Sequence, residues 1–143
     1  MRDMRYLAKN MYFDSLESVE LPEAIQSELD RINRTGELSA QLLTNGIPAK
    51  LDQKVTIILL RMFQENMNNV LSHSKAKNCQ VTLDYTKDQF KLQITDDGEA
   101  REPENKIANR SALIGAKMTA NSEPGKGTTI TICLPFLSTN SQE

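Results

Sequence analysis

The chain has 143 residues, of which 38% are hydrophobic and 25% charged, and its formal net charge is −2 at pH 7. These values are ordinary for a soluble protein that forms one domain with a hydrophobic core. The sequence contains no long basic run and no apolar stretch near the ~18–20 residues of a membrane span, so we expect no nucleic-acid partner and no direct membrane contact. We expect a cytoplasmic chain, although a larger parent protein could still be membrane-anchored.

The first 50 residues predict two helices and a strand. Residues 1–13 carry apolar side chains on one helical face. Pro22 fits the first turn of a second helix, and Gly36 is a suitable stop after it. Residues 37–44 alternate in part and predict a strand, which a turn over residues 45–48 should end.

The strongest helical pattern covers residues 51–71, whose apolar positions form one arc. Near its end, Glu65, Asn69 and His73 follow one another at i, i+4 and i+8, which predicts a stack along one side of the helix. Because unpaired polar groups are costly to bury, such a row indicates a function. Oxygen ligands from Glu65 and Asn69 suit Mg²⁺ that is bound through few protein atoms and a phosphate. Asn66 falls on the apolar arc itself, which is an unusual place for an amide.

The second half of the chain predicts four strands and one short helix. The strands cover residues 81–85, 90–94, 117–122 and 128–134, and the helix covers residues 107–116. The two cysteines, Cys79 and Cys133, fall inside strand patterns and are interpreted as buried thiols, without the spacing of a metal site. Paired strands with helices between them predict an α+β sandwich, in which helices cover one face of a mainly antiparallel sheet.

Several segments now resemble one protein family. Residues Gln64–Ala76 resemble the N box of the GHKL (Bergerat-fold) ATPases, and of sensor histidine kinases in particular. Asp96-Asp97-Gly98 resembles the start of their first glycine box, Asp-x-Gly-x-Gly, and residues 123–129 resemble the last one, Pro-Gly-x-Gly-Thr. Residues Arg110–Ala116 and Arg31–Gly36 look like segments of the kinases that phosphorylate NarL-type response regulators. The resemblance covers nearly the whole chain, and it implies the Bergerat fold with a mixed sheet.

The resemblance implies roles for three residues at the phosphate end of the site. Asn69 matches the Mg²⁺ ligand that bridges the ATP phosphates, and Glu65 matches a carboxylate that orders water or acts as a base in hydrolytic relatives. His73 matches a position beside the phosphates. A structural, half-buried histidine is an equally good interpretation of His73.

At the adenine end, Asp96 matches the carboxylate that accepts a hydrogen bond from the adenine amino group. Gly98 permits the backbone to approach the base. Thr128 matches a hydroxyl that supports a water at the base, and Gly125 and Gly127 shape the turn before it. Taken alone, each of these motifs could be a plain turn or hairpin loop.

The chain departs from the family pattern in two places. The first glycine box continues as Gly98-Glu99-Ala100, where the relatives have a second glycine. The second glycine box, whose amides and helix N-terminus hold the phosphates in relatives, is absent, and only residues 99–106 bridge the gap. A shortened lid and a natural degeneration both fit this. Asn66 also differs, because relatives usually carry a small or aliphatic residue there.

From the resemblance we expect residues 1–20 to be the end of a dimerisation helix and a connector, residues 21–137 the ATPase domain, and residues 138–143 a polar tail. The expected function is that of the catalytic ATP-binding domain of a sensor histidine kinase, with ATP and Mg²⁺ as cofactors. Its partners would be the phosphoacceptor domain of the parent kinase and a response regulator. The single histidine lies in the N box, so the phosphoacceptor must lie elsewhere. The fragment could be monomeric, whereas the parent would be a homodimer.

Two alternatives remain open at this stage. The first is a degenerate or lid-truncated module that binds a nucleotide or a partner without kinase activity, which the missing second glycine box favours. The second is another GHKL branch, such as an anti-sigma-type serine kinase. The connector-like N-terminus and the helix over residues 110–116 argue against that branch.

Overall fold

The structure is a computed structural model, which describes residues 20–99, 111–123, 125 and 127–136. The elements in chain order are α2 (Leu21–Thr35), β1 (Ser39–Asn45), α3 (Gln53–Asn69), the π-helix η1 (Val70–Ser74), β2 (Asn78–Tyr85), β3 (Gln89–Asp96), β4 (Lys117–Glu123) and β5 (Gly127–Pro135). The predicted helix over residues 1–13 and the predicted tail lie outside the described residues.

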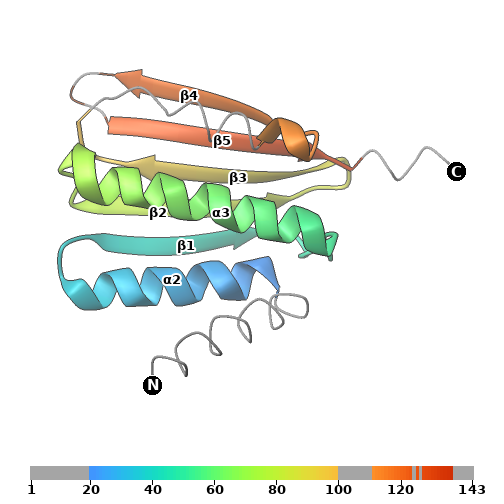
Figure 1. The fold of residues 1–143 in the computed structure, drawn as a ribbon, viewed down its shortest axis with the longest axis horizontal. Helices are drawn as coiled ribbons and strands as arrows, with labels where there is room; N and C mark the ends of the chain where they lie inside the picture. Colours follow the sequence, from blue (N-terminus) through green and yellow to red (C-terminus); the bar gives the residue numbers. More distant parts are fainter. Residues whose placement is uncertain (1–19, 100–110, 124, 126, 137–143) are drawn as a thin grey trace, which may run out of the picture.

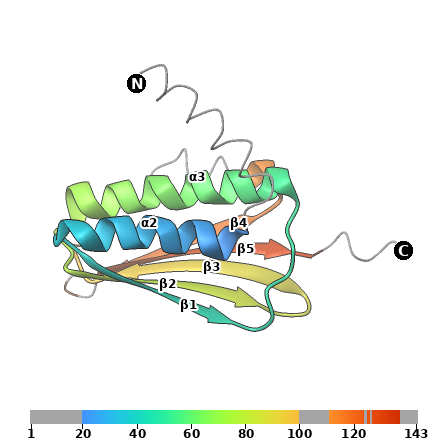
Figure 2. The ribbon, with the colours of Figure 1, turned by 90° about the horizontal axis from the view of Figure 1, so that it is seen from below.

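The strands form one five-stranded sheet in the order β1-β2-β3-β5-β4. β1 pairs with β2 in parallel, and the other three pairs are antiparallel. The helices α2 and α3 lie side by side on one face of this sheet (Figures 1 and 2). The predicted α+β sandwich with a mainly antiparallel mixed sheet is therefore confirmed.

Alternating side chains give the sheet an apolar inner face, which packs against the helices, and a polar outer face. In β3, Phe90, Leu92 and Ile94 are buried beneath the helices. The side chains between them point outward, where Gln93 donates a hydrogen bond to Thr131 on β5 over 3.2 Å. The core is thus a single layer between the helices and the inner face.

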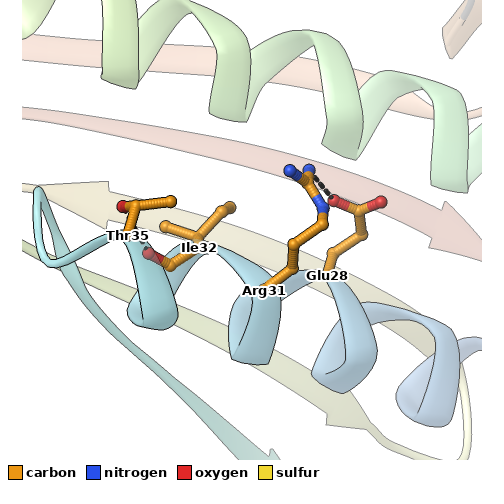
Figure 3. Close-up of polar contacts among 4 residues, drawn as sticks. All are labelled: Glu28, Arg31, Ile32 and Thr35. Atoms are coloured by element: carbon orange, nitrogen blue, oxygen red, sulfur yellow. Dashed lines mark hydrogen bonds and ion pairs between the residues drawn. The ribbon is translucent and has the colours of Figure 1, made fainter.

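Helix α2 begins and ends as the sequence predicts. Pro22 lies in its first turn, and Gly36 caps its end with a φ of 79°, in the left-handed region that glycine tolerates. On its last turns, Arg31 forms an ion pair with Glu28 over 2.6 Å, and the Thr35 hydroxyl donates to the Ile32 carbonyl over 2.7 Å (Figure 3). The ion pair is largely exposed, so its contribution to stability is small.

Asn33, also on α2, covers part of the open edge of the sheet. Its side-chain Nδ2 donates to the Ala40 carbonyl over 2.9 Å, and its Oδ1 accepts from the Ala40 N–H over 2.8 Å. Both main-chain groups of Ala40 point to the edge that β2 leaves free, because one strand residue directs its N–H and C=O to the same side. The amide therefore replaces a neighbouring strand at this position.

Helix α3 starts at the N-cap Asp52, whose side chain accepts from the Lys54 N–H over 3.1 Å. It ends at Asn69, and residues 70–74 continue as η1. The prediction of one α-helix through Leu71 is therefore wrong at its last turn. The π-helix is closed by Lys75, which has a φ of 58°.

The predicted short helix over residues 107–116 falls partly outside the described residues. Within the described part, residues 111–113 are helical, and a turn over residues 114–115 leads into β4. None of the helices in the described part of the chain is long and apolar enough to cross a membrane.

Candidate functional site

Three polar side chains form a row across the inner face of the sheet, where apolar residues would be expected. The register pairs Asp96 on β3 with Thr128 on β5, and Thr128 with Ser122 on β4. Asp96 is 3% exposed and Thr128 is 2% exposed. The hydroxyls of Ser122 and Thr128 share a hydrogen bond of 3.0 Å. We call Asp96, Thr128 and Ser122 the polar row.

Asp96 belongs to the inner face because it continues the alternation of Leu92 and Ile94 in β3. Its Oδ1 accepts a hydrogen bond of 2.9 Å from the Gly98 N–H. This bond closes a bend at Gly98 and fixes the carboxylate at the end of the strand. Gly98 itself is half-buried in this bend.

The neighbouring Asp97 has a different, structural role. Its exposed carboxylate accepts hydrogen bonds from the N–H groups of Lys77 and Asn78 over 2.8 and 2.9 Å, and from the Asn78 side chain over 2.9 Å. The Asn78 bonds, with the Lys77 bond after them, lower the pKa of Asp97 below its usual value. Asp97 thus connects the end of β3 by hydrogen bonds to the segment that follows η1.

The β4–β5 turn packs against the same strand end. Gly127 has a φ of 85°, and a Cβ atom on it would lie 1.9 Å from the Asp96 carbonyl oxygen. Gly125 also has a positive φ, of 81°, but a Cβ there would meet nothing within 4 Å. Both glycines fit the turn, as predicted, and Gly127 alone is also required by close backbone contact.

Helix α3 carries the N box to the level of the polar row. Met67 contacts Cys79 with its sulfur 4.0 Å from the cysteine sulfur, and Cys79 is the register partner of Asp96. This part of α3 therefore lies at the level of Asp96. Glu65 and Asn69 are half-buried on the helix, one turn apart on the same side, as their spacing predicts.

His73 lies beyond the end of α3, in η1. π-helical turns within or beside α-helices are frequently found at functional sites. After η1, Lys75 forms an exposed ion pair of 3.7 Å with Glu99, the residue that follows Gly98. The end of the N box and the first glycine box are thus neighbours in space.

Two further polar residues, Ser122 and Asn66, belong with the predicted site residues. Ser122 was not predicted, because β4 has no clear alternation of apolar and polar residues; its register with Thr128 reveals it. Asn66 is 2% exposed, and its Nδ2 has no hydrogen-bond partner among the residues that the structure describes.

The outer face of the sheet carries a shallow depression of about 290 Å³. It is lined by residues of β1, β2 and β3, among them Ser39, Gln41, Asn78 and Thr95. Asp96 also contributes to its lining, whereas Asn69 and Thr128 do not. In the described part of the chain, no three His, Cys, Asp or Glu side chains are grouped to hold a metal ion.

Comparisons with known proteins connect the chain to sensor kinases. No family model matches it. An uncharacterized sensor-like histidine kinase of Chloroflexus aurantiacus is 30% identical over 152 residues, which cover 92% of this chain and 26% of that protein. The signal transduction histidine-protein kinase/phosphatase DegS of Bacillus subtilis is 33% identical over 99 residues, which cover 61% of this chain and 26% of DegS. The chain spans about a quarter of the length of these relatives.

Solved structures share the fold at lower identity. The Acinetobacter baumannii histidine kinase AdeS aligns with a TM-score of 0.68 and 12% identity, over 95% of this chain and 80% of that one. The ATP binding domain of PrrB from Mycobacterium tuberculosis aligns with a TM-score of 0.63 and 16% identity, over 82% of this chain and 94% of that one.

Proposed function

Because this chain is a histidine kinase ATP-binding domain of the GHKL superfamily, we propose that it binds ATP beside the polar row and presents the γ-phosphate to a phosphoacceptor histidine outside the chain. The observation that carries this proposal is the contact of Met67 on α3 with Cys79, the register partner of Asp96, which brings the N box to the level of the polar row. Phosphoryl transfer of this kind depends mostly on positioning and charge neutralisation.

At the adenine end, Asp96 would accept a hydrogen bond from the exocyclic amino group. A carboxylate is an acceptor only, so it distinguishes this amino group from the carbonyl oxygen of guanine. The bond from the Gly98 N–H fixes this carboxylate at the end of β3. The Thr128 hydroxyl, held by Ser122, would support a water at the base.

At the phosphate end, Asn69 would supply one oxygen ligand to Mg²⁺, with the ATP phosphates supplying others. The half-buried amide suits a cation held through few protein atoms, and the described residues offer no acidic cluster that would bind it alone. Glu65 lies one turn away and would order a water or act as a base. His73 would line the phosphates.

The parent protein would supply the remaining parts of the reaction. We place the ATPase domain at residues 21–137, the end of a dimerisation helix and a connector at residues 1–20, and the chain in the cytoplasm. The phosphoacceptor domain and a response regulator of the NarL type would be its partners, as the segments Arg31–Gly36 and Arg110–Ala116 suggest.

Calorimetry with ATP and ADP, with and without Mg²⁺, tests the proposal. We expect Asp96→Asn to weaken ATP binding by about 10- to 100-fold, since it replaces a charged acceptor of a buried hydrogen bond. Asp97→Asn is the matched control and should leave the affinity nearly unchanged. Asn69→Ala should abolish the effect of Mg²⁺, whereas Asn68→Ala, at the exposed neighbouring position, should not. A folded wild-type chain that binds no ATP would contradict the proposal.

The second candidate is a nucleotide-binding or docking module without kinase activity. The absence of glycine from residues 99–106 favours it, because the backbone amides of such a segment would otherwise hold the phosphates. In this candidate ATP and ADP bind equally well and Mg²⁺ makes no difference. Phosphoryl transfer to the parent's dimerisation domain, measured with labelled ATP, separates the two functions directly.

A further inference from the structure

Asn66 is a buried amide on α3 to which the proposed function gives no role. It is 2% exposed, and its Nδ2 lacks a hydrogen-bond partner among the described residues. A buried amide without its hydrogen bonds is costly, commonly by about 1–3 kcal/mol. Its position on an otherwise apolar arc makes a purely structural reason hard to find, since a leucine of similar size would pack there without this cost.

The direction in which Asn66 points follows from the helix geometry. Successive residues are about 100° apart, so Asn66 lies about 60° around α3 from Asn69, on the side nearer to the sheet. Met67 lies about 100° further round, where it contacts Cys79 on β2. Asn66 is therefore placed between the exposed flank that carries Asn69 and the face that packs on β2.

The arrangement of the elements shows which strands lie on that flank. In Figures 1 and 2, α3 has α2 on one side and the strands β5 and β4 on the other. α3 runs from right to left in Figure 1, with the sheet behind it. A right-handed helix that runs in this direction turns from the side of β5 toward the sheet as the chain advances. Because Met67 contacts the sheet at Cys79, the residue before it, Asn66, lies on the side of β5.

Asn66 also lies at the level of the polar row along the helix. It adjoins Met67, which contacts the register partner of Asp96. Asp96 and Thr128 are directed to the same inner face from β3 and β5. The amide on α3 thus lies at the level of the carboxylate and the hydroxyl on the inner face of the sheet.

We infer that Asn66 is a further base-recognition residue, whose Nδ2 donates a hydrogen bond to a ring nitrogen of the adenine bound at Asp96. The ring nitrogens of adenine are acceptors, and an asparagine amide is a good donor to them. Asp96 would accept a hydrogen bond from the amino group of the base, and Asn66 would donate one to a ring nitrogen. The two residues would thus recognise one donor and one acceptor of adenine. This inference rests on the proposed binding of ATP.

The test compares ATP with 1-deaza-, 3-deaza- and 7-deaza-ATP, each of which lacks one acceptor nitrogen, in calorimetric titrations of the whole chain. Asn66→Leu removes the amide donor and keeps a side chain of similar volume. Asn66→Ala replaces it in the same titrations if the leucine variant does not fold. Met67→Leu is the matched control for a change in the neighbouring buried side chain.

We expect Asn66→Leu to weaken ATP binding by about 5- to 30-fold, the usual effect of one buried hydrogen bond. One of the three deaza analogues should bind to the wild type more weakly than ATP does, by a similar factor. The same analogue and ATP should bind to Asn66→Leu with equal affinity. Met67→Leu should keep the preference of the wild type among the four nucleotides.

Three results would overturn the inference. The first is an unchanged ATP affinity of Asn66→Leu together with a raised melting temperature of the free protein, which indicates a structural residue. The second is an equal loss for all four nucleotides, and the third is a wild type that binds all four equally. If wild-type binding of ATP depends on Asp96 in these cases, the proposed function stands and only the role of Asn66 fails.

Discussion

The α-carbon of Gly127 packs directly on the main-chain carbonyl of Asp96, so closely that an added Cβ would lie 1.9 Å from the oxygen. This contact joins the turn before β5 to the end of β3, where the polar row begins. The last glycine box and the first are therefore parts of one structure, although about 30 residues of sequence separate them.

Gly127→Ala should destabilise the fold by about 3 kcal/mol or more, because the clash with the Asp96 carbonyl adds to the cost of a left-handed backbone. The shift of Asp96 should also weaken ATP binding. Gly125→Ala has a similar φ but free space around it, so we expect a loss of about 1 kcal/mol. Urea denaturation measures both, and equal losses would show that the contact with Asp96 is unimportant.

Asp97→Asn should lower stability at neutral pH by about 1 kcal/mol, a value reduced by solvent around the exposed carboxylate. The pKa of Asp97 is lowered in the folded state from its usual 3.8. The ionised carboxylate therefore stabilises the fold above pH 3.8, and this contribution is lost as the pH falls through the lower folded pKa.

The stability difference between wild type and Asp97→Asn should thus be constant near neutral pH and shrink in acid. Thermal unfolding from pH 7 down to the acid limit of folding measures it. A difference that grows in acid would contradict the assignment of these bonds to Asp97.

Asn33→Ala should destabilise the fold by about 1–2 kcal/mol, because it removes both hydrogen bonds to Ala40. Asn33→Asp keeps an acceptor for the Ala40 N–H but loses the donor to its carbonyl, so it should also destabilise. Asn68→Ala makes the same chemical change at an exposed helical position and should be near neutral. Hydrogen exchange at Ala40 should accelerate in the Asn33 variants only, and unchanged exchange would show that the edge is protected by other means.

Tyr85 should titrate far above a free tyrosine. Burial, with a smaller effect from Glu20, raises the pKa of Tyr85 from 10.0 to about 12. A folded pKa above the unfolded one stabilises the protein below pH 10, and this stabilisation is lost as the pH rises through 12. Absorbance at alkaline pH, as the difference between wild type and Tyr85→Phe, should show ionisation near pH 12. Ionisation near pH 10 in the folded protein would contradict it.

The strands and helices could be predicted because each has a clear period in the sequence. The alternation of Leu92, Ile94 and Asp96 also places Asp96, and not Asp97, on the inner face. Because Asp97 faces outward, its carboxylate can accept hydrogen bonds from Lys77 and Asn78. These residues lie about 20 positions earlier in the sequence, so no local pattern predicts the contact.

What the sequence could not provide are the features that depend on contacts between distant segments. The two bonds of Asn33 to Ala40 need the position of α2 relative to the sheet edge. Ser122 joins the polar row only through the register of β4 with β5. After Asn69 the backbone changes from the α-helical to the π-helical hydrogen-bond pattern. The spacing of apolar residues does not predict this change, because the alternative hydrogen-bond partners have similar energies.

The register of β5 divides its residues by parity, with Thr128 facing the helices and Thr129 facing solvent. Inserting one residue between Gly127 and Thr128 would exchange the two sets, so that Thr128 and the apolar residues after it would turn outward together. Over evolution or in protein engineering, β5 therefore accepts changes of length only in steps of two residues.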